Sequence, residues 1–150
     1  MSRRELAEEN FLKGYNCTQS LVLAFADLLP VEPSALLKLS CSFGGGMGRL
    51  REVCGAVSGM FLVLGMLYGY DTPETGAKKA AQYARVQELA HRFAGKNGSI
   101  VCRELLGLRK KEDPPTPEAR TAEYYAKRPC KALIGAAAEL LENYIREHPV

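Results

Sequence analysis

The sequence lacks the features that mark several common classes of protein. It has no long run of charge of one sign, and 20 basic against 17 acidic residues leave a net charge of +3. Nucleic-acid binding needs clustered lysine and arginine, so this balance argues against such a partner. No stretch of useful length alternates polar and apolar residues, which argues against a sheet protein. The first ten residues, MSRRELAEEN, have neither an apolar core nor a small-residue cleavage site, so we expect no signal peptide.

Long uncharged runs are also scarce, and the longest covers residues 53–70, VCGAVSGMFLVLGMLYGY. Its length reaches the lower edge of what a membrane-spanning helix needs. It contains four glycines, a serine and two tyrosines, so we interpret it as a buried core helix and expect no stable membrane insertion. We therefore expect a cytoplasmic protein, where thiols stay reduced and the five cysteines do not form a disulfide framework.

What the sequence does contain is helical periodicity along nearly its whole length. A chain of 150 residues is typical of one domain with one core. We predict a single all-α domain over residues 1–150, a compact bundle of five to seven helices around a buried central helix at about residues 52–69. The amphipathic segment 72–98 begins with Thr-Pro-Glu and ends at Gly95 or at Asn97-Gly98, which are helix start and stop signals. The mixed-charge stretch 108–117 is predicted to be a loop.

Four of the five cysteines fall at predicted helix starts. They are Cys17 after the N-cap candidate Asn16, Cys54 in the first turn of the central helix, Cys102 three residues after the cap candidate Ser99, and Cys130 after Pro129. The first turn of a helix has unpaired N–H groups and a positive partial charge, which ease the ionisation of a thiol. Thiolate is the form that binds metals and attacks disulfides. The neighbouring side chains that should act in the same direction are Arg51, Arg103, Arg128 and Lys131.

Cys41 lies near the end of its predicted helix, and we interpret it as inert. The same interpretation stays open for the other cysteines, because a free cysteine often behaves as a small buried hydrophobe. No Cys-x-x-Cys pair occurs, so neither a thioredoxin-type motif nor a zinc ribbon is encoded locally. The four candidates are separated by 37, 48 and 28 residues, so the fold must assemble any site they share.

A cluster of glycines precedes Cys54, in the stretch SFGGGMGRLREVCGAVSG at residues 42–59. Glycine permits positive φ and close approach of the backbone to another group, and successive N–H groups in such a loop attract anions. A nucleotide-binding loop is disfavoured, because the glycines follow a helix and lack the Gly-Lys-Ser/Thr ending. The candidate cofactor-binding glycines are Gly44, Gly45, Gly46, Gly48 and Gly55.

These residues resemble a known family. The fragments NCTQSLVLAF, FGGGMG, CGAVSG and CRELLG, with the late Cys130, are similar to the redox-active four-cysteine family known by its C_GCAxxG_C_C signature. The resemblance covers about residues 5–145. The family is similar to the non-haem part of the split-Soret cytochromes, which carry haem and an iron–sulfur centre, but no Cys-x-x-Cys-His occurs here, so covalent haem is not implied. The family's four cysteines correspond to Cys17, Cys54, Cys102 and Cys130, which implies a redox or metal-binding role for them.

Three functions are compatible with these observations. In the first, the four cysteines bind an iron–sulfur cluster, most simply [2Fe–2S], for electron transfer with an unidentified redox partner protein. In the second, pairs of the same cysteines are the catalytic groups of a thiol–disulfide oxidoreductase, and structural zinc is a weaker variant of the metal site. In the third, the chain is a non-catalytic helical interaction module, such as a homodimer, with structural cysteines. No Ser-His-Asp set or paired-carboxylate pattern indicates any other enzyme chemistry.

Overall fold

The structure, a computed structural model, describes residues 1–73, 76–109 and 112–150 and is all-α over this range, as predicted. Six of the described helices have seven or more residues: α1 (Arg3–Leu12), α2 (Cys17–Leu23), α3 (Pro33–Ser40), α5 (Gly55–Tyr68), α6 (Ala77–Asn97) and α9 (Cys130–Glu147). The shorter elements are α4 (Gly44–Met47), α7 (Cys102–Leu105), α8 (Ala122–Lys127) and the 3-10 turns η1 (Ala26–Leu28) and η2 (Cys41–Phe43). Among the described residues, one isolated antiparallel bridge joins Val53 to Val101.

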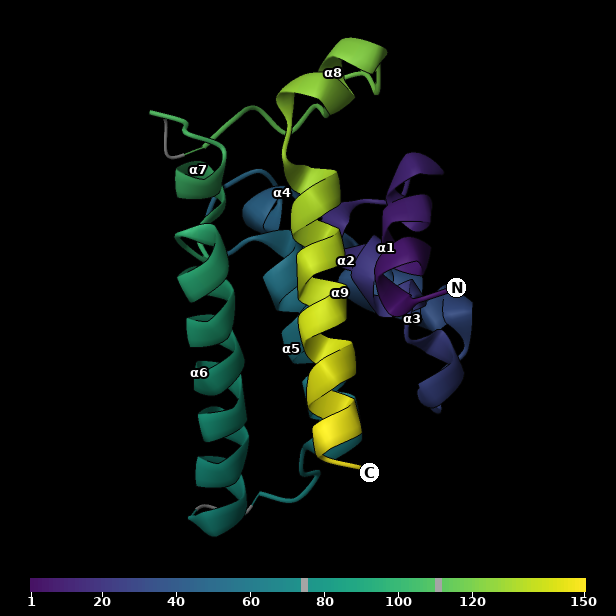
Figure 1. The fold of residues 1–150 in the computed structure, drawn as a ribbon, viewed down its shortest axis with the longest axis vertical. Coiled ribbons are helices and arrows are strands. Elements are labelled where there is room, and N and C mark those ends of the chain that lie inside the picture. Colours follow the sequence, from purple (N-terminus) through teal and green to yellow (C-terminus); the bar gives the residue numbers. More distant parts are fainter. Residues whose placement is uncertain (74–75, 110–111) are drawn as a thin grey trace.

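The long helices α5, α6 and α9 lie along the longest axis of the molecule, and α1, α2 and α3 cover one side of them (Figure 1). α5 contacts α2, α6 and α9, so it occupies the middle of the bundle. α9 also contacts α1, α2 and α6. The start of α9 faces the region of α4 and α7, and α8 lies beyond that end (Figure 1). This end of the bundle is where the candidate residues gather.

The predicted central helix is present, and it begins at Gly55 rather than at residue 52. Met60, Val63 and Leu64 of this helix are completely buried, because its sequence is apolar on nearly every face. Gly59 allows α2 to approach closely, since a Cβ there would lie 3.0 Å from Cβ of Leu21. Residues of α1, α2, α6 and α9 join α5 in one hydrophobic core.

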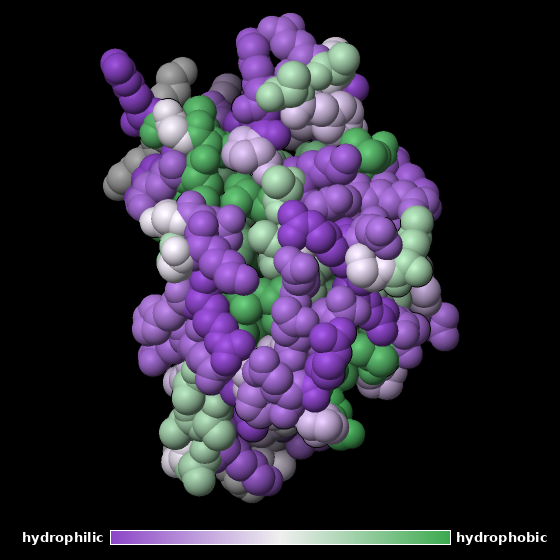
Figure 2. Space-filling view, viewed as in Figure 1, coloured by the Kyte–Doolittle hydropathy of each residue, from purple (hydrophilic) through white to green (hydrophobic). Residues whose placement is uncertain are grey.

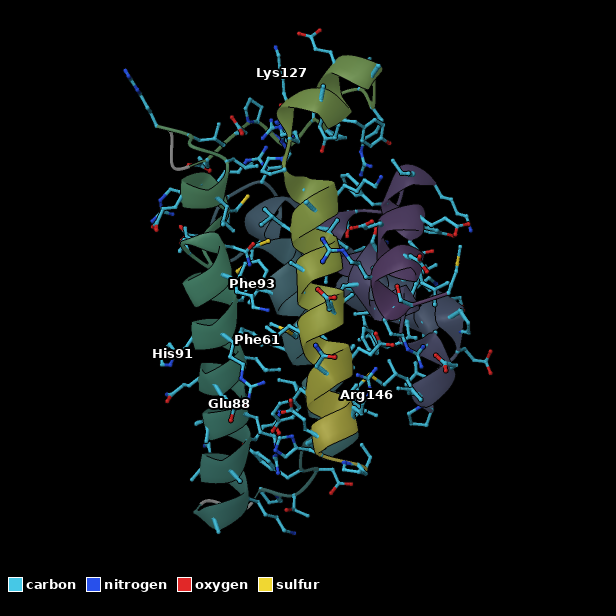
Figure 3. All side chains as sticks on the ribbon, viewed as in Figure 1. Phe61, Glu88, His91, Phe93, Lys127 and Arg146 are labelled. Carbon is cyan, nitrogen blue, oxygen red and sulfur yellow. The ribbon has the colours of Figure 1, made fainter. Side chains whose placement is uncertain are left out.

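α6 shows how the sequence signals and the structure compare. The helix ends before Gly98, whose φ of 96° is the left-handed conformation expected at a C-cap. It begins at Ala77 after Gly76 rather than at the Thr-Pro-Glu signal, of which Glu74 lies outside the described residues. Phe93 points into the bundle while His91 points away from it (Figure 3).

The surface agrees with packing of the apolar faces inside the bundle. The face seen in Figure 2 is mainly hydrophilic, and hydrophobic residues are visible in narrow areas between polar side chains. Among the helices that the structure describes, none combines the length and the apolar character that crossing a membrane requires. The most apolar of them, α5, has 14 residues.

Candidate functional site

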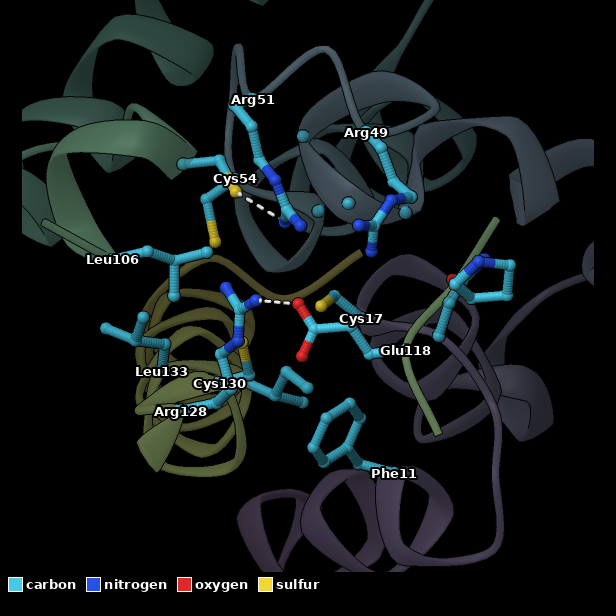
Figure 4. A pocket seen from close by; sticks show the side chains of 18 of the residues that line it. Phe11, Cys17, Arg49, Arg51, Cys54, Leu106, Glu118, Arg128, Cys130 and Leu133 are labelled. Atoms are coloured by element: carbon cyan, nitrogen blue, oxygen red, sulfur yellow. Dashed lines mark hydrogen bonds and ion pairs between the residues drawn. The ribbon is translucent and has the colours of Figure 1, made fainter. Parts of the chain in front are cut away.

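All four candidate cysteines border one cavity of about 570 Å³ (Figure 4). The five candidate glycines line the same cavity. The cysteines come from the starts of α2, α5, α7 and α9, which meet at one end of the bundle. Cys41 is exposed and lies outside the set of described residues that line the cavity. The fold therefore brings together residues that are far apart in the sequence.

Helix starts position Cys17 and Cys130. Cys17 is the first residue of α2, as predicted, and Asn16 caps that helix by accepting a hydrogen bond from the Gln19 N–H at 2.9 Å. The side chain of Gln19 accepts in return from the Asn16 N–H at 3.2 Å, which completes a capping box. Cys130 is the first residue of α9, and Pro129 is its N-cap rather than its first helical residue.

Backbone pairing positions Cys54 and Cys102. The Cys54 N–H donates to the Ile100 carbonyl at 2.7 Å, and the Cys102 N–H donates to the Glu52 carbonyl at 2.5 Å. These bonds flank the bridge between Val53 and Val101. They place side by side two cysteines that 48 residues separate in the sequence.

This pairing corrects two predicted helix starts. Cys54 is the N-cap of α5, with extended backbone, and does not lie in its first turn. Cys102 is the first residue of α7, whose N-cap is Val101 and not Ser99. The Ser99 side chain instead accepts from the Val101 N–H at 2.9 Å. The reason is that backbone paired across a bridge is extended and cannot begin a helix earlier.

Two of the glycines make room for cysteines. A Cβ on Gly46 would lie 2.6 Å from Cβ of Cys102, and one on Gly55 would lie 2.8 Å from Cβ of Cys17. Both distances are shorter than two carbon atoms can approach without displacement. Gly46 also has a φ of 69°, a conformation that favours glycine. Larger residues at these positions would push the cysteines away from the cavity.

The segment 44–51, which we call the glycine loop, has left-handed backbone at three other residues as well. Met47, Arg49 and Arg51 have φ values of 70°, 69° and 59°, which cost a residue with a side chain about 1–2 kcal/mol each. The sequence predicted positive φ for the glycines alone. The unusual backbone directs the Arg49 and Arg51 side chains into the cavity, where Figure 4 shows them next to each other.

Arg51 contacts a cysteine other than the one expected. Its Nη1 donates to Sγ of Cys102 at 3.6 Å, and its Nε donates to Oδ2 of Asp113 at 2.8 Å. The residue is 5% exposed. Of the other predicted cations, Arg128 lines the cavity and pairs with Glu118 (Figure 4). Arg103 pairs with Glu52 at 3.2 Å and, like Lys131, is not among the described residues of the lining.

Residues 113–128, which we call the cover segment, form a wall of the site that the sequence did not reveal. Pro115, Pro117 and Tyr124 of this segment line the cavity. Arg120 fixes the segment to α1 and the following turn, because it donates to the carbonyls of Phe11 at 3.0 Å and Tyr15 at 3.1 Å. A proline-rich stretch of mixed charge is typical of a solvated loop, so no sequence signal distinguished it.

Burial and mutual contact give the four thiols different acidities. The pKa of Cys17 is lowered to about 7, mainly because the Cys130 thiol donates a hydrogen bond to it, and Arg120 adds to this effect. The same hydrogen bond and burial raise the pKa of Cys130. Burial raises the pKa of Cys54 to about 12, and it raises the pKa of Cys102 against the opposing effect of Arg51.

The expectation that each of these helix starts would favour thiolate is therefore wrong for three of the four cysteines. Burying a thiolate costs more free energy than the partial positive charge at a helix N-terminus contributes. These three thiols therefore stay protonated. All five cysteines are free. In the described parts of the chain, no group of three or more His, Cys, Asp or Glu side chains is arranged around a point that could hold one metal ion. Four soft sulfur donors are nevertheless the ligand set of iron–sulfur and zinc centres.

Comparison with known proteins agrees with the four-cysteine arrangement. The model of the family described as "Putative redox-active protein (C_GCAxxG_C_C)" matches residues 15–144, a range that includes all four cavity cysteines. Neither a curated protein nor a solved structure matches the chain. Because the family model covers most of the sequence, the chain belongs to the C_GCAxxG_C_C family of redox-active proteins.

Proposed function

We propose that the four cavity cysteines, Cys17, Cys54, Cys102 and Cys130, hold an iron–sulfur cluster, most simply [2Fe–2S], and that the protein exchanges single electrons with a redox partner protein. The observation that carries the proposal is that four thiols from four separate segments border one cavity. Such a cluster takes four cysteine ligands, and it supplies one-electron transfer at a potential that its surroundings set.

The acidities of the thiols support a metal-binding role. Cys54, Cys102 and Cys130 are held protonated because a thiolate at these positions would be buried near other sulfurs. A metal cation that replaces the protons removes this penalty, so binding should release protons and stabilise the fold.

The charge of the surrounding side chains fits an anionic centre. Arg49, Arg51, Arg120 and Arg128 line the cavity, whereas Asp113 and Glu118 are the carboxylates paired with three of them. Four positive and two negative side chains leave an excess of about +2, which would balance the charge of about −2 on an oxidised four-cysteine [2Fe–2S] centre.

The arrangement of the ligand residues supports two irons rather than one zinc. A single zinc ion needs its ligands to converge on one point, about 2.3 Å from each sulfur, and no three described side chains of the ligand types do so. Two sulfurs at each iron are enough for a two-iron centre. Cys17 and Cys130, whose thiols shift each other's pKa and which border the same cavity, would supply one such pair.

Iron and acid-labile sulfide analysis of protein purified without oxygen tests the proposal. We expect about two irons and two sulfides per chain, with visible absorbance. Cys54→Ser should lose most of the iron, whereas the matched variant Cys41→Ser, on an exposed residue, should keep it. A colourless protein that also resists anaerobic reconstitution would reject the cluster.

A specific observation favours a second candidate, a thiol–disulfide exchange protein. Cys130 lowers the pKa of Cys17 to about 7 and borders the same cavity, which suits the pair to the roles of an attacking and a resolving cysteine. The Cys17 thiolate would attack a disulfide of the partner and release one partner thiolate. Cys130 would then lose its proton and displace the second partner sulfur. The partner gains two electrons, and Cys17 and Cys130 are left joined by a disulfide.

Thiol counts before and after mild oxidation test this second candidate. The metal-free protein should lose two of its five free thiols, and Cys130→Ser should lose none. If the metal-free protein retains all of its thiols, the exchange mechanism is rejected.

A further inference from the structure

The cavity is much larger than the sulfurs and a small cluster need. The four inorganic atoms of a [2Fe–2S] core would fill about 120 Å³, if each takes about the 30 Å³ share of a water molecule. The cavity measures about 570 Å³, and pockets that bind small organic molecules measure about 300–1,000 Å³. We propose that this cavity also binds a small organic anion with an apolar body, next to the cysteine sulfurs.

One wall of the cavity is suited to the apolar body. Phe11, Leu133 and Ile134 line it and are almost completely buried. Leu106 and Pro115 add apolar surface from α7's end and from the cover segment. Figure 4 shows Phe11, Leu106 and Leu133 around the space that the labelled cysteines border. A molecule in this space would exchange water for apolar contact and would lie beside sulfur.

The opposite wall is suited to the anionic group. Arg49 and Arg51 extend into the cavity from the glycine loop (Figure 4). Arg51 already donates hydrogen bonds to Cys102 and Asp113. Arg49 donates its Nε to the Pro114 carbonyl at 2.7 Å, while its Nη2 lies 3.9 Å from Asp113, beyond ordinary hydrogen-bond distance. The terminal N–H groups of Arg49 are therefore the donors best placed to bind a carboxylate or sulfonate.

Charge selects the class of molecule. The Arg49 donors make the selection locally, because a cation would be repelled by this guanidinium and a neutral molecule would leave its N–H groups without a charged acceptor, whether or not the cysteines hold a cluster. The carboxylate of Glu118 does not change this selection, because it is paired with Arg128. This inference names the substrate class of the proposed redox site. A role of the bound anion in electron transfer rests on the proposed function, but binding of the anion does not depend on what the cysteines hold.

Fluorescence titration with 1-anilinonaphthalene-8-sulfonate, an anion with an aromatic body, tests the inference. We expect saturable binding of one probe to the natively folded protein, both as purified anaerobically and after reconstitution with iron and sulfide. N-phenyl-1-naphthylamine has the same rings without the sulfonate and should bind about tenfold more weakly, because one charge-assisted hydrogen bond is lost.

Two variants locate the binding. Arg49→Gln should weaken the sulfonate probe about tenfold and leave the neutral probe unchanged, while Arg92→Gln on α6, which is not among the described residues of the lining, should change neither. Leu106→Trp should block both probes by filling the cavity, and Leu39→Trp, on an exposed residue of α3, should block neither. Thermal unfolding of each variant confirms that it is folded before the titration.

The outcomes separate this inference from the cluster. Saturable binding that Arg49→Gln and Leu106→Trp both weaken supports the inference, whatever the iron content of the sample. It is overturned if neither this probe nor naphthalene-2-sulfonate binds the folded protein, or if binding is insensitive to both variants. Iron and sulfide analysis of the same samples decides the cluster independently: probe binding to a protein that stays iron-free after reconstitution rejects the cluster alone, and iron without probe binding rejects the anion site alone.

Discussion

Arg51 joins Cys102 to Asp113, with Nη1 3.6 Å from the sulfur and Nε 2.8 Å from the carboxylate oxygen. The three residues belong to the glycine loop, the start of α7 and the cover segment, so one guanidinium connects three walls of the cavity. Its hydrogen bond favours the thiolate of Cys102. Its ion pair with Asp113 fastens the cover segment to the glycine loop.

The first prediction concerns this guanidinium. Arg51→Gln should lower the free energy of unfolding by about 2–3 kcal/mol, somewhat less than for a fully buried pair because Asp113 remains partly exposed. The matched control Arg92→Gln breaks an exposed pair with Glu88 and should cost less than about 1 kcal/mol. Urea unfolding of the metal-free proteins measures both, and equal losses would show that Arg51 has no special structural role.

The second prediction concerns the reactivity of Cys17. In metal-free protein the rate of its alkylation by iodoacetamide should rise with pH and reach half its maximum near pH 7, because its pKa is lowered to about 7. Cys130→Ala removes the donor of the stabilising hydrogen bond and should move the midpoint toward the ordinary thiol value of about 8.5. Mass spectrometry of the labelled peptide gives the site, and an unchanged midpoint in the variant would show that the hydrogen bond does not set the pKa.

The third prediction is a loss of stability at alkaline pH. The raised pKa of Cys54, about 12, means that the folded protein keeps a proton that the unfolded chain releases above about pH 8.5. The free energy of unfolding should therefore be constant with respect to this group below pH 8.5 and fall as the pH rises above it. Cys54→Ala should flatten the decline between pH 8.5 and 10 in urea unfolding of metal-free protein. A wild-type curve with no decline would contradict the assignment.

The fourth prediction compares two glycines of the same helix. Gly55→Ala places a methyl group 2.8 Å from Cβ of Cys17 and should lower the free energy of unfolding by about 1–3 kcal/mol. Gly65→Ala, which meets nothing within 4 Å, should raise it by about 0.5–1 kcal/mol. Iron content of the anaerobically purified proteins should fall in the first variant and stay unchanged in the second. Opposite signs are expected, so a common sign would contradict the packing argument.

Local sequence signals predicted much of the fold and grouped the four cysteines that border the cavity. The Asn16 cap, the apolar run of α5 and the Gly98 stop each act within a few residues, so each was visible in the sequence. The four cysteines were grouped because all lie near helix starts, and the structure places them around one cavity. Cys41 was set apart by the same criterion, and it lies on the surface.

The remaining features depend on contacts between distant segments. The bridge between Val53 and Val101 fixes where α5 and α7 begin. No alternation of polar and apolar residues marks the two paired segments, so the sequence did not indicate it. The partner of Arg51 could not be predicted, because Cys54 is close in sequence while Cys102 is close in space. The raised pKa values of the thiols follow from burial, which only the assembled fold determines.

The bridge between Val53 and Val101 also has a consequence for biosynthesis. It keeps Cys54 beside Cys102, and the hydrogen bond from the Thr18 hydroxyl to the Gly55 carbonyl, at 2.9 Å, fastens α2 and Cys17 to the same unit. Cys17, Cys54 and Cys102 are thus held by contacts within the first 105 residues. Cys130 is the first residue of α9. A chain that folds from its N-terminus would bring these three sulfurs together first, and Cys130 would complete the set only when α9 packs against them.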